Sequence, residues 1–461
     1  MPVVAAYMVP HPPLIVPEVG RGGERQIEET ARAYREVARD IARLRPQTLI
    51  VSSPHARAYA DYFQVAPEKE ASGDFGRFGA PQVRIQAACD NELREALCAL
   101  AEKRGFPAGK LGPREGQLDH GTLVPLFFVN QEYTSYRLLR VGLSGLPLSA
   151  RYAFGRLIRE AVEATGRRAV LIASGDLSHK LRQSGPYGFA PEGPEYDRRV
   201  MDVCSRAAFG ELLDFEEDLC ERAAECGHRS FVIMAGALDG LSVKARCLSH
   251  EGVTGVGYGI CMFTPGEADS RRRFLDAWKR RREEQLRLRR ESEDSHVRLA
   301  RETICRFVRS GEILPVPAWV PQQMRSGRAG VFVSLHLDGR LRGCIGTCLP
   351  VRGSIAEEII ANAVSASTED PRFPPVRPEE LERLEISVDV LSAPEAVDRP
   401  EELDPKRYGI IVRSGNRRGL LLPDLDGVDT AEEQISIARK KAGIAPWQKV
   451  TLERFQVVRH R

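Results

Sequence analysis

In the stretch Met8-Val9-Pro10-His11-Pro12-Pro13-Leu14, a histidine directly follows the first strand that the sequence predicts, over residues 3–9. Proline fixes its own φ and biases the preceding residue away from helix, so these residues favour a stiff extended loop. Rigid loops at strand ends are where α/β proteins carry catalytic and metal-binding side chains. A single His-Pro-Pro is also explained by a half-buried histidine in an ordinary turn. Other motifs in the sequence are therefore needed to distinguish a functional histidine from a structural one.

Three further histidines occupy the same kind of position. His55 follows the short apolar run at residues 48–51, His120 follows Leu118-Asp119, and His179 follows the predicted strand at residues 169–173. Helix-like and strand-like segments alternate as far as about residue 263, which predicts an α/β domain with a mixed central sheet flanked by helices. The carboxyl ends of parallel strands lie along one edge of such a sheet, so the four loops can converge on one cleft.

A cluster of this kind supports a narrow range of chemistry. Two neutral imidazoles and one carboxylate leave positions open on an octahedral ion, which suits non-heme Fe(II) binding substrate and dioxygen together. Histidines that are not ligands can move protons. Glu225 offers the carboxylate, in Ala223-Ala224-Glu225-Cys226-Gly227-His228 ahead of a predicted apolar helix. A glutamate near a helix start also interacts favourably with the helix dipole, so both roles stay open.

The four histidine motifs together resemble the class III extradiol dioxygenase (LigB-like) superfamily and its Memo branch, over about residues 1–264. The motifs are His-Pro-Pro, Ser-Pro-His, Asp-His-Gly and Gly-Asp-Leu-Ser-His, in that order. The resemblance implies that His11, His55 and Glu225 hold Fe(II). It implies that His179 is the catalytic acid and base, with His120 as a supporting or substrate-contacting group. The implied function is that of an oxidoreductase, a ring-cleaving dioxygenase that uses O2 on a catecholic or related aromatic substrate.

The third metal ligand stays open within this resemblance. In Memo proteins that position is a cysteine ahead of a Val-x-Tyr strand, and counting back from Val256-Gly257-Tyr258 reaches Cys247. Glu251 is a further candidate in the same loop. A thiolate would favour a softer or redox-active metal, so copper or zinc is the alternative to iron. The corresponding function is a Memo-like metal-binding or adaptor protein without ring cleavage. A buried structural thiol is the plain alternative for Cys247.

Basic residues are concentrated after this domain. Residues 271–290 contain ten Lys or Arg and three acidic residues, a local charge of +7; the whole chain carries +3, which leaves −4 elsewhere. The sequence predicts a charged helical linker over residues 265–293, because its apolar stripe is thin. The functional alternative is an arm that binds nucleic acid. It is disfavoured because runs of charged residues usually lie on solvent-exposed helix faces, and no aromatic residues that could stack on bases accompany this one.

The segment at residues 294–461 predicts a separate α+β domain, with strand runs and helices that do not alternate strictly. Strands are expected at residues 330–337, 340–346, 384–391 and 450–458, a hairpin at 408–422, and helices at 297–308, 354–367 and 431–442. The motif Leu-Arg-Gly-Cys-Ile-Gly-Thr, with Asp370-Pro-Arg-Phe-Pro-Pro375 and Leu421-Leu-Pro423, is similar to the signature of the AMMECR family. That family implies no particular activity. An AMMECR domain joined to a Memo/LigB-like domain resembles the bacterial AmmeMemoRadiSam system, which implies a radical S-adenosylmethionine protein as partner.

Cys344 is a candidate for a second site. It lies between glycines on a predicted strand close to Arg342, whose charge could lower the pKa of the thiol and make it a nucleophile. A small buried thiol in a tight hairpin is the plain alternative.

Composition excludes several classes of protein. No apolar run approaches the roughly 20 residues that cross a bilayer, and no basic-then-apolar leader follows Met1. The ten cysteines form no Cys-x-x-Cys pair, so neither a zinc knuckle nor a disulfide framework is indicated. We therefore expect a cytoplasmic protein with reduced thiols.

Overall fold

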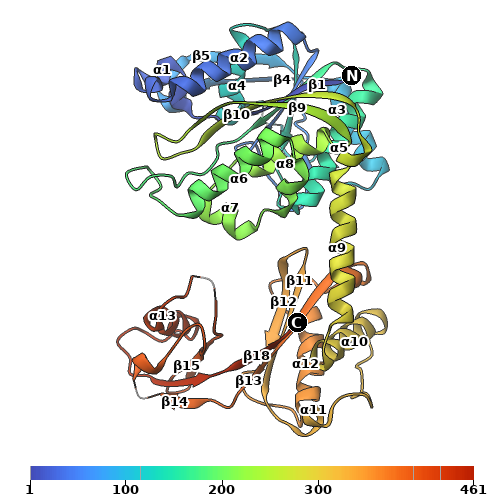
Figure 1. The fold of residues 1–461 in the computed structure, drawn as a ribbon, viewed down its shortest axis with the longest axis vertical. Helices are drawn as coiled ribbons and strands as arrows, with labels where there is room; N and C mark the ends of the chain where they lie inside the picture. The colour runs from blue at the N-terminus through green and yellow to red at the C-terminus, as the bar shows by residue number, and fades with distance from the viewer. Residues whose placement is uncertain (1, 115, 398, 426) are drawn as a thin grey trace. The chain divides into compact units, whose positions relative to one another are not determined.

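In a computed structural model of the chain, the structure describes residues 2–114, 116–397, 399–425 and 427–461 (Figure 1). The chain divides into two compact units, Met1–Arg280 and Arg281–Arg461. The boundary falls within helix α9 (Phe274–Glu291), so the linker expected over residues 265–293 is largely helical. None of the described helices is long and apolar enough to span a membrane.

Unit 1 is built on a six-stranded mixed sheet in the order β7-β2-β8-β1-β10-β9. The first four strands are parallel, and the last two continue the sheet as antiparallel neighbours at one edge. The strand bounds are β7 (Arg137–Gly142), β2 (Thr48–Ser53), β8 (Ala169–Ser174), β1 (Val3–Val9), β10 (Tyr258–Ala268) and β9 (Leu241–Glu251).

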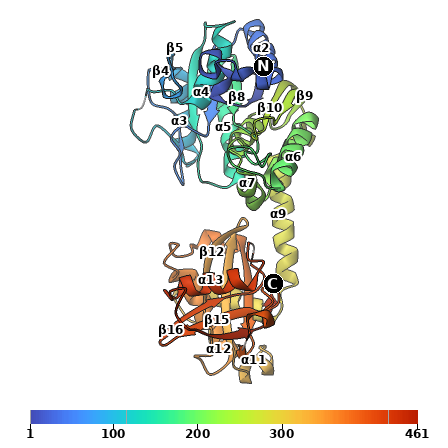
Figure 2. The same ribbon diagram turned by 90° about the vertical axis from the view of Figure 1, so that its left-hand side faces the viewer.

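Both faces of this sheet are buried. Ala6 and Met8 of β1 belong to one apolar core, whereas Tyr7 and Val9 belong to the other, as the two-residue repeat of a strand requires. Helices cover each face (Figures 1 and 2). The bounds are α3 (Asn91–Lys103), α5 (Leu148–Thr165) and α8 (His228–Ala237) on the first core, and α2 (Glu28–Leu44) and α4 (His120–Asn130) on the second. The predicted α/β class with a mixed sheet is confirmed.

Smaller elements complete unit 1. A hairpin of β4 (Glu70–Phe75) and β5 (Ala80–Ala88) lies in a region where no strand was predicted. Helices α6 (Glu192–Arg206) and α7 (Glu217–Ala223) come between β8 and α8 in the sequence.

Unit 2 contains two four-stranded sheets, in the orders β12-β11-β13-β18 and β14-β17-β15-β16. Every pairing in them is antiparallel, and helices pack on them, so the predicted α+β class is confirmed. The strand bounds are β11 (Gly330–Leu337), β12 (Arg340–Gly346), β13 (Leu384–Leu391), β14 (Glu395–Val397), β15 (Gly409–Ser414), β16 (Arg417–Leu421), β17 (Thr451–Phe455) and β18 (Val457–His460). The main helices are α10 (Ser295–Ser310), α12 (Ile355–Thr368) and α13 (Ala431–Lys441); Figure 2 shows α13 against the second sheet.

The last strand expected in the sequence is two strands. β17 belongs to one sheet and β18 to the other, with Gln456 between them. The N–H of Gln456 donates to Ser392 Oγ at 2.9 Å instead of entering either ladder, so the chain changes sheets at this residue.

Candidate metal and active site

The loops that follow three neighbouring parallel strands meet at one edge of the unit 1 sheet. His11 lies two residues beyond β1, His55 two residues beyond β2, and Asp176 two residues beyond β8. Because β2, β8 and β1 are adjacent and parallel, their carboxyl ends lie side by side. The structure therefore brings together loops that are far apart in the sequence.

The imidazole rings of His11 and His55 are nearly perpendicular, and their Nε2 atoms lie 3.0 Å apart. Nδ1 of His11 lies 3.0 Å from Ser174 Oγ, and that hydroxyl donates to the carbonyl oxygen of Gly121 at 2.5 Å. The Ser174 hydroxyl has one proton, so Nδ1 of His11 must be the donor to Ser174 and Nε2 carries the lone pair. This is the tautomer in which an imidazole binds a metal through Nε2.

Both histidines are held in the neutral form. Burial and, after it, the neighbouring His55 lower the pKa of His11 to about 3. Burial also lowers the pKa of His55, against the opposing charges of Asp119 and Asp176. Two lone pairs cannot face each other favourably at 3.0 Å, so either a proton on His55 or a cation occupies the space between the two Nε2 atoms.

The thiol of Cys226 is the third group of this cluster. Its Sγ lies 3.7 Å from Nε2 of His11 and accepts from the backbone N–H of Asp176 at 3.2 Å. The ligand atoms of His11, His55 and Cys226 all lie within 4.8 Å of one another. Burial raises the pKa of Cys226 well above its ordinary value. The free side chain is therefore a thiol, and binding to a metal would remove its proton.

Two glycines allow the Cys226 loop to approach the loop after β8. A Cβ atom on Gly175 would lie 2.1 Å from the Cα atom of Gly227, which leaves no room for a side chain. The N–H of Gly227 donates to the carbonyl oxygen of Asp176 at 3.1 Å. Upstream, α7 ends at Ala223, and the left-handed φ of 52° at the next residue, Ala224, turns the chain out of the helix. This backbone path places Cys226 beside His11.

The spacing of the three groups fits a metal ion. Imidazole nitrogens and a thiolate at bond lengths of about 2.1 and 2.3 Å lie about 3.0 to 3.6 Å apart when they bind adjacent positions. The distances from His11 Nε2 are 3.0 Å to His55 Nε2 and 3.7 Å to Cys226 Sγ. Two imidazoles and a thiolate form a donor set that suits iron, copper or zinc.

Glu225, the carboxylate expected from the sequence, binds elsewhere. Its Oε2 accepts from the backbone N–H of His228 at 2.6 Å, at the start of α8, and from the Tyr196 hydroxyl at 3.4 Å. Among the described residues, the group of possible ligands around His11 contains Cys226 and not Glu225. Burial raises the pKa of Glu225 to about 7. The helix-start role, which the sequence left open, accounts for these contacts.

The other two candidates for the third ligand also lie outside the cluster. Sγ of Cys247 is 2.6 Å from Sγ of Cys261, its direct partner across β9 and β10. Oε2 of Glu251 accepts from both the N–H and the hydroxyl of Thr30 at 2.6 Å, near the start of α2. In the sequence, Cys226 is marked only by its place beside Glu225, and it was not among the predicted ligands.

A carboxylate and another histidine border the three ligand atoms. Oδ2 of Asp176 lies 4.0 Å from Nε2 of His11 and 4.0 Å from Nε2 of His179. Its Oδ1 accepts from the backbone N–H of His11 at 2.7 Å. Burial raises the pKa of Asp176 to about 6. Nε2 of His179 is buried and has no hydrogen-bond partner among the described residues. This nitrogen therefore keeps an unused hydrogen-bonding position beside Asp176.

Aromatic rings flank the cluster. The ring of His120 lies 3.9 Å from the ring of His55 and 5.4 Å from that of Phe78. The ring of Tyr187 stacks on His179 at 5.0 Å. Phe78 is 37% exposed and Tyr187 is 58% exposed, so apolar surface is present beside the histidines. Such rings could contact a planar substrate.

In unit 2, the structure gives Cys344 and Arg342 different partners. Arg342 binds the carboxylate of Glu380 at 2.8 and 3.0 Å. The thiol of Cys344 accepts from Ser334 Oγ at 3.2 Å, and its backbone N–H donates to Asp370 at 2.8 Å. No contact between Arg342 and the thiol is present among the described residues, so the expected activation by Arg342 has no geometric support.

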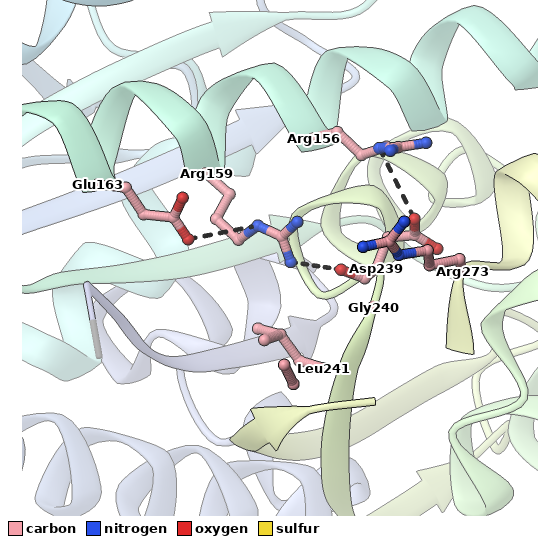
Figure 3. Close-up of a pocket in the computed structure, with 8 residues that line it drawn as sticks. Arg156, Arg159, Glu163, Asp239, Gly240, Leu241 and Arg273 are labelled. Carbon is pink, nitrogen blue, oxygen red and sulfur yellow. Dashed lines mark hydrogen bonds and ion pairs between the residues drawn. The ribbon is translucent and has the colours of Figure 1, made fainter. Parts of the chain in front are cut away.

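A separate pocket of about 320 Å³ lies in unit 1 between α5 and the start of β9 (Figure 3). Arg156 in its wall pairs with Asp276 at 2.7 Å and with Asp239 at 3.7 Å. Arg159 pairs with Glu163 at 3.6 Å and donates to the carbonyl oxygen of Asp239. Arg156 and Arg159 are thus already paired with acidic residues of unit 1, and no histidine is among the residues that line this pocket.

Two arginines in the part of α9 that belongs to unit 2 are paired with acidic residues of the same unit. Arg287 binds Glu284 at 2.7 Å and Glu291 at 2.5 Å. Arg290 binds Glu382 at 2.6 Å. This pairing reduces the positive charge that a nucleic acid would need.

Comparisons with known proteins match both parts of the chain. Residues 5–261 match the family model described as the catalytic LigB subunit of aromatic ring-opening dioxygenase, and residues 297–460 match the AMMECR1 model. A protein of Clostridium acetobutylicum is 41% identical over 463 residues, covering 99% of this chain and 98% of the relative. A protein of Thermotoga maritima is 52% identical over 171 residues, covering 37% of this chain and 98% of the relative.

Two solved structures are also similar to parts of the chain. An uncharacterized protein from Pyrococcus horikoshii is 34% identical, with a TM-score of 0.34, and covers 36% of this chain and 88% of its own. An uncharacterized protein from Escherichia coli K12 is 14% identical, with a TM-score of 0.40, and covers 56% of this chain and 99% of its own. None of these four names states an activity.

Proposed function

The chain belongs to the family of the catalytic LigB subunit of aromatic ring-opening dioxygenases, joined to an AMMECR1 domain, and from this premise we propose that unit 1 is a metal-dependent oxidoreductase. Its proposed substrates are O2 and a catecholic or related aromatic compound. One observation carries the proposal: the ligand atoms of His11, His55 and Cys226 converge, with Asp176 and His179 beside them.

His11, His55 and Cys226 are the proposed metal ligands. Non-heme Fe(II) held by them would supply open positions at which an aromatic diol and O2 bind together. Ser174 supports this role because it fixes the tautomer of His11. Asp176 supports it by accepting from the backbone N–H of His11. Outer partners of this kind are typically worth about ten- to a hundredfold in metal affinity.

His179 is the proposed acid and base. Burial lowers its pKa, so the imidazole is neutral at pH 7 and can accept a proton from a substrate hydroxyl at its unpartnered Nε2. Asp176, 4.0 Å away, would stabilise the imidazolium that results. His179 can then return the proton to the product. His120 and Phe78 would contact the substrate ring from the side of His55.

Oxygen uptake tests this proposal. Anaerobically prepared protein loaded with Fe(II) should consume O2 when a catechol is added and form a yellow ring-opened product. The His179→Gln protein should keep its iron and lose about 10²- to 10⁴-fold in kcat. The proposal fails if no catechol changes either the O2 uptake or the spectrum of the iron-loaded protein.

A Memo-like metal protein without ring cleavage is the second candidate. The specific observation in its favour is that a thiol, and not the carboxylate of Glu225, lies beside His11 and His55. A thiolate favours copper or another soft metal over Fe(II). Competition between Fe(II) and Cu(I) for the anaerobic protein separates the two candidates. Preference for Cu(I) without O2 uptake on catechols would support the second and contradict the first.

The combination of domains leads us to propose a radical S-adenosylmethionine protein as a partner, and the two proteins would act on one substrate in sequence. The likeness of the two domains to the AmmeMemoRadiSam system supports this proposal. Affinity capture with the full chain as bait should retain such a protein from the same organism. Its presence in the lysate without retention would contradict the proposal.

A further inference from the structure

Unit 2 contains a second group of side chains that can bind a metal. Asp294 precedes the first residue of α10, and His296 lies in the first turn of that helix. His460 is the last residue of β18, an edge strand of the first sheet. Their ligand atoms all lie within 4.8 Å of one another. The group joins parts of unit 2 that are 166 residues apart in the sequence.

The two oxygens of Asp294 have different tasks. Oδ1 accepts from the backbone N–H groups of His296 at 2.9 Å and Val297 at 3.2 Å, which is an ordinary helix cap. Oδ2 is not needed for the cap. It accepts a hydrogen bond from Nδ1 of His460 and lies 3.5 Å from Nδ1 of His296. One carboxylate oxygen thus lies between two imidazole nitrogens.

The imidazole of His296 is incompletely bonded. Its Nδ1 is buried and has no hydrogen-bond partner among the described residues, because the 3.5 Å distance to Asp294 is too long for a good hydrogen bond. The rings of His296 and His460 are stacked, with centroids 3.7 Å apart. A buried nitrogen without a partner costs free energy unless a hydrogen-bond partner or a cation satisfies it.

The surroundings leave room for an open coordination position. The Asp294 side chain is 43% exposed, whereas His296 is 21% and His460 is 16% exposed. Water can therefore complete the coordination of an ion held by the three side chains. Two imidazoles and one carboxylate suit divalent zinc, or a similar borderline ion, better than magnesium or calcium.

We propose that Asp294, His296 and His460 form a site for a zinc-like divalent cation in unit 2. The ion would replace the proton between Asp294 and His460 and satisfy Nδ1 of His296. It would link the start of α10 to the end of β18. A metal that binds only the folded arrangement stabilises it by mass action, so the ion should stabilise unit 2. The site is separate from the proposed function of unit 1.

Zinc counting in the Cys226→Ala chain tests the proposal, because Cys226 is shared by both groups of possible metal ligands that the structure places in unit 1, His11-His55-Cys226 and Asp176-His179-Cys226. After chelation, dialysis against micromolar Zn²⁺ and elemental analysis, Cys226→Ala should retain about one zinc per chain. Cys226→Ala/His296→Ala should retain none. Cys226→Ala/His336→Ala is the matched control, since His336 is a half-buried histidine of the same unit outside the cluster, and it should retain the ion.

The Asp294→Asn variant controls for the possibility that a substitution removes zinc by disturbing the fold. Asparagine caps helices as well as aspartate does, so metal-free circular dichroism should be unchanged while zinc affinity falls by about tenfold or more. Zinc should raise the melting temperature of Cys226→Ala but not that of Cys226→Ala/Asp294→Asn. Equal zinc content in Cys226→Ala and Cys226→Ala/His296→Ala overturns the proposal, and so does a Cys226→Ala chain that holds no zinc. Either result would mean that Asp294, His296 and His460 form only a stacked, hydrogen-bonded cluster that binds no metal.

Discussion

Glu225 and Cys226 are neighbours in one loop, yet their side chains have different partners. Glu225 accepts from the N–H of His228 at 2.6 Å, while Sγ of Cys226 lies 3.7 Å from Nε2 of His11. The close approach of Gly175 to Gly227 is part of the backbone path that places Cys226, and not Glu225, beside the histidines. A one-residue difference in this loop therefore changes the proposed donor set from a carboxylate to a thiolate.

Metal binding should distinguish these two side chains. We expect Cys226→Ser to weaken binding of Fe(II) or Cu(I) at the His11 site by at least about tenfold, because a ligand is lost. Glu225→Gln should stay close to wild type, since the amide oxygen can still accept from His228. Anaerobic competition with a chromophoric chelator measures both. If Glu225→Gln weakens metal binding and Cys226→Ser does not, Glu225 is the ligand.

Glu225 should also leave a signature in the pH dependence of stability. Its carboxyl has a pKa of about 7 in the folded chain, against 4.5 for the ordinary group. Between these values the folded state holds a proton that the unfolded state has released, so this group's contribution to stability falls as pH rises from about 4.5 to about 7. Glu225→Gln removes that loss. The melting temperature of the metal-free variant relative to wild type should therefore rise from pH 5 to pH 7 and level off above. A difference that is independent of pH would contradict this account.

Sequence alone could predict part of this site. His11 and His55 were identifiable because each follows a strand that is apolar and short, and neighbouring strand ends converge. Cys226 was not identifiable, because its position depends on a left-handed residue at Ala224 and on a glycine contact between distant loops. Counting along the sequence led to Cys247, which the structure places opposite Cys261.

At the scale of elements, α5 and α8 pack closely through a pair of glycines. A Cβ atom on Gly236 would lie 1.9 Å from the carbonyl oxygen of Tyr152, and one on Gly155 would lie 2.0 Å from the carbonyl oxygen of Ile233. These helices cover the face of the sheet that carries Ala6 and Met8. The two backbones can approach this closely only because both positions lack a side chain.

We expect Gly236→Ala to destabilise unit 1 by about 1 to 3 kcal/mol, because the added methyl group meets backbone and neither helix can move alone. Gly23→Ala is the control, since a Cβ there would meet only Nε2 of Gln26 at 3.9 Å. Urea unfolding measures both. Equal stability of the two variants would show that the α5–α8 contact can relax.

Local turn chemistry explains which elements were predictable. The strands expected at residues 330–337 and 340–346 match β11 and β12 in their bounds, because Asp338 and Gly339 form a two-residue turn with φ of 53° and 81°. The hairpin of β4 and β5 gave no such signal. Its first strand, Glu-Ala-Ser-Gly-Asp-Phe, has low strand propensity, and only Ala71 and Phe75 are fully buried.

At the scale of the whole molecule, the chain has separate apolar cores in its two units. Every core cluster among the described residues draws its members from one unit alone. Calorimetry should therefore show two unfolding transitions, and Gly236→Ala should shift only one of them. A single transition that moves as a whole would contradict the division.

The proposed function depends on a metal held by His11, His55 and Cys226. X-ray absorption at the iron edge of anaerobically Fe(II)-loaded protein tests this set of ligands. We expect a sulfur neighbour at about 2.3 Å together with imidazole nitrogens, and loss of the sulfur signal in Cys226→Ser. A shell of nitrogen and oxygen only, unchanged by Cys226→Ser, would contradict it.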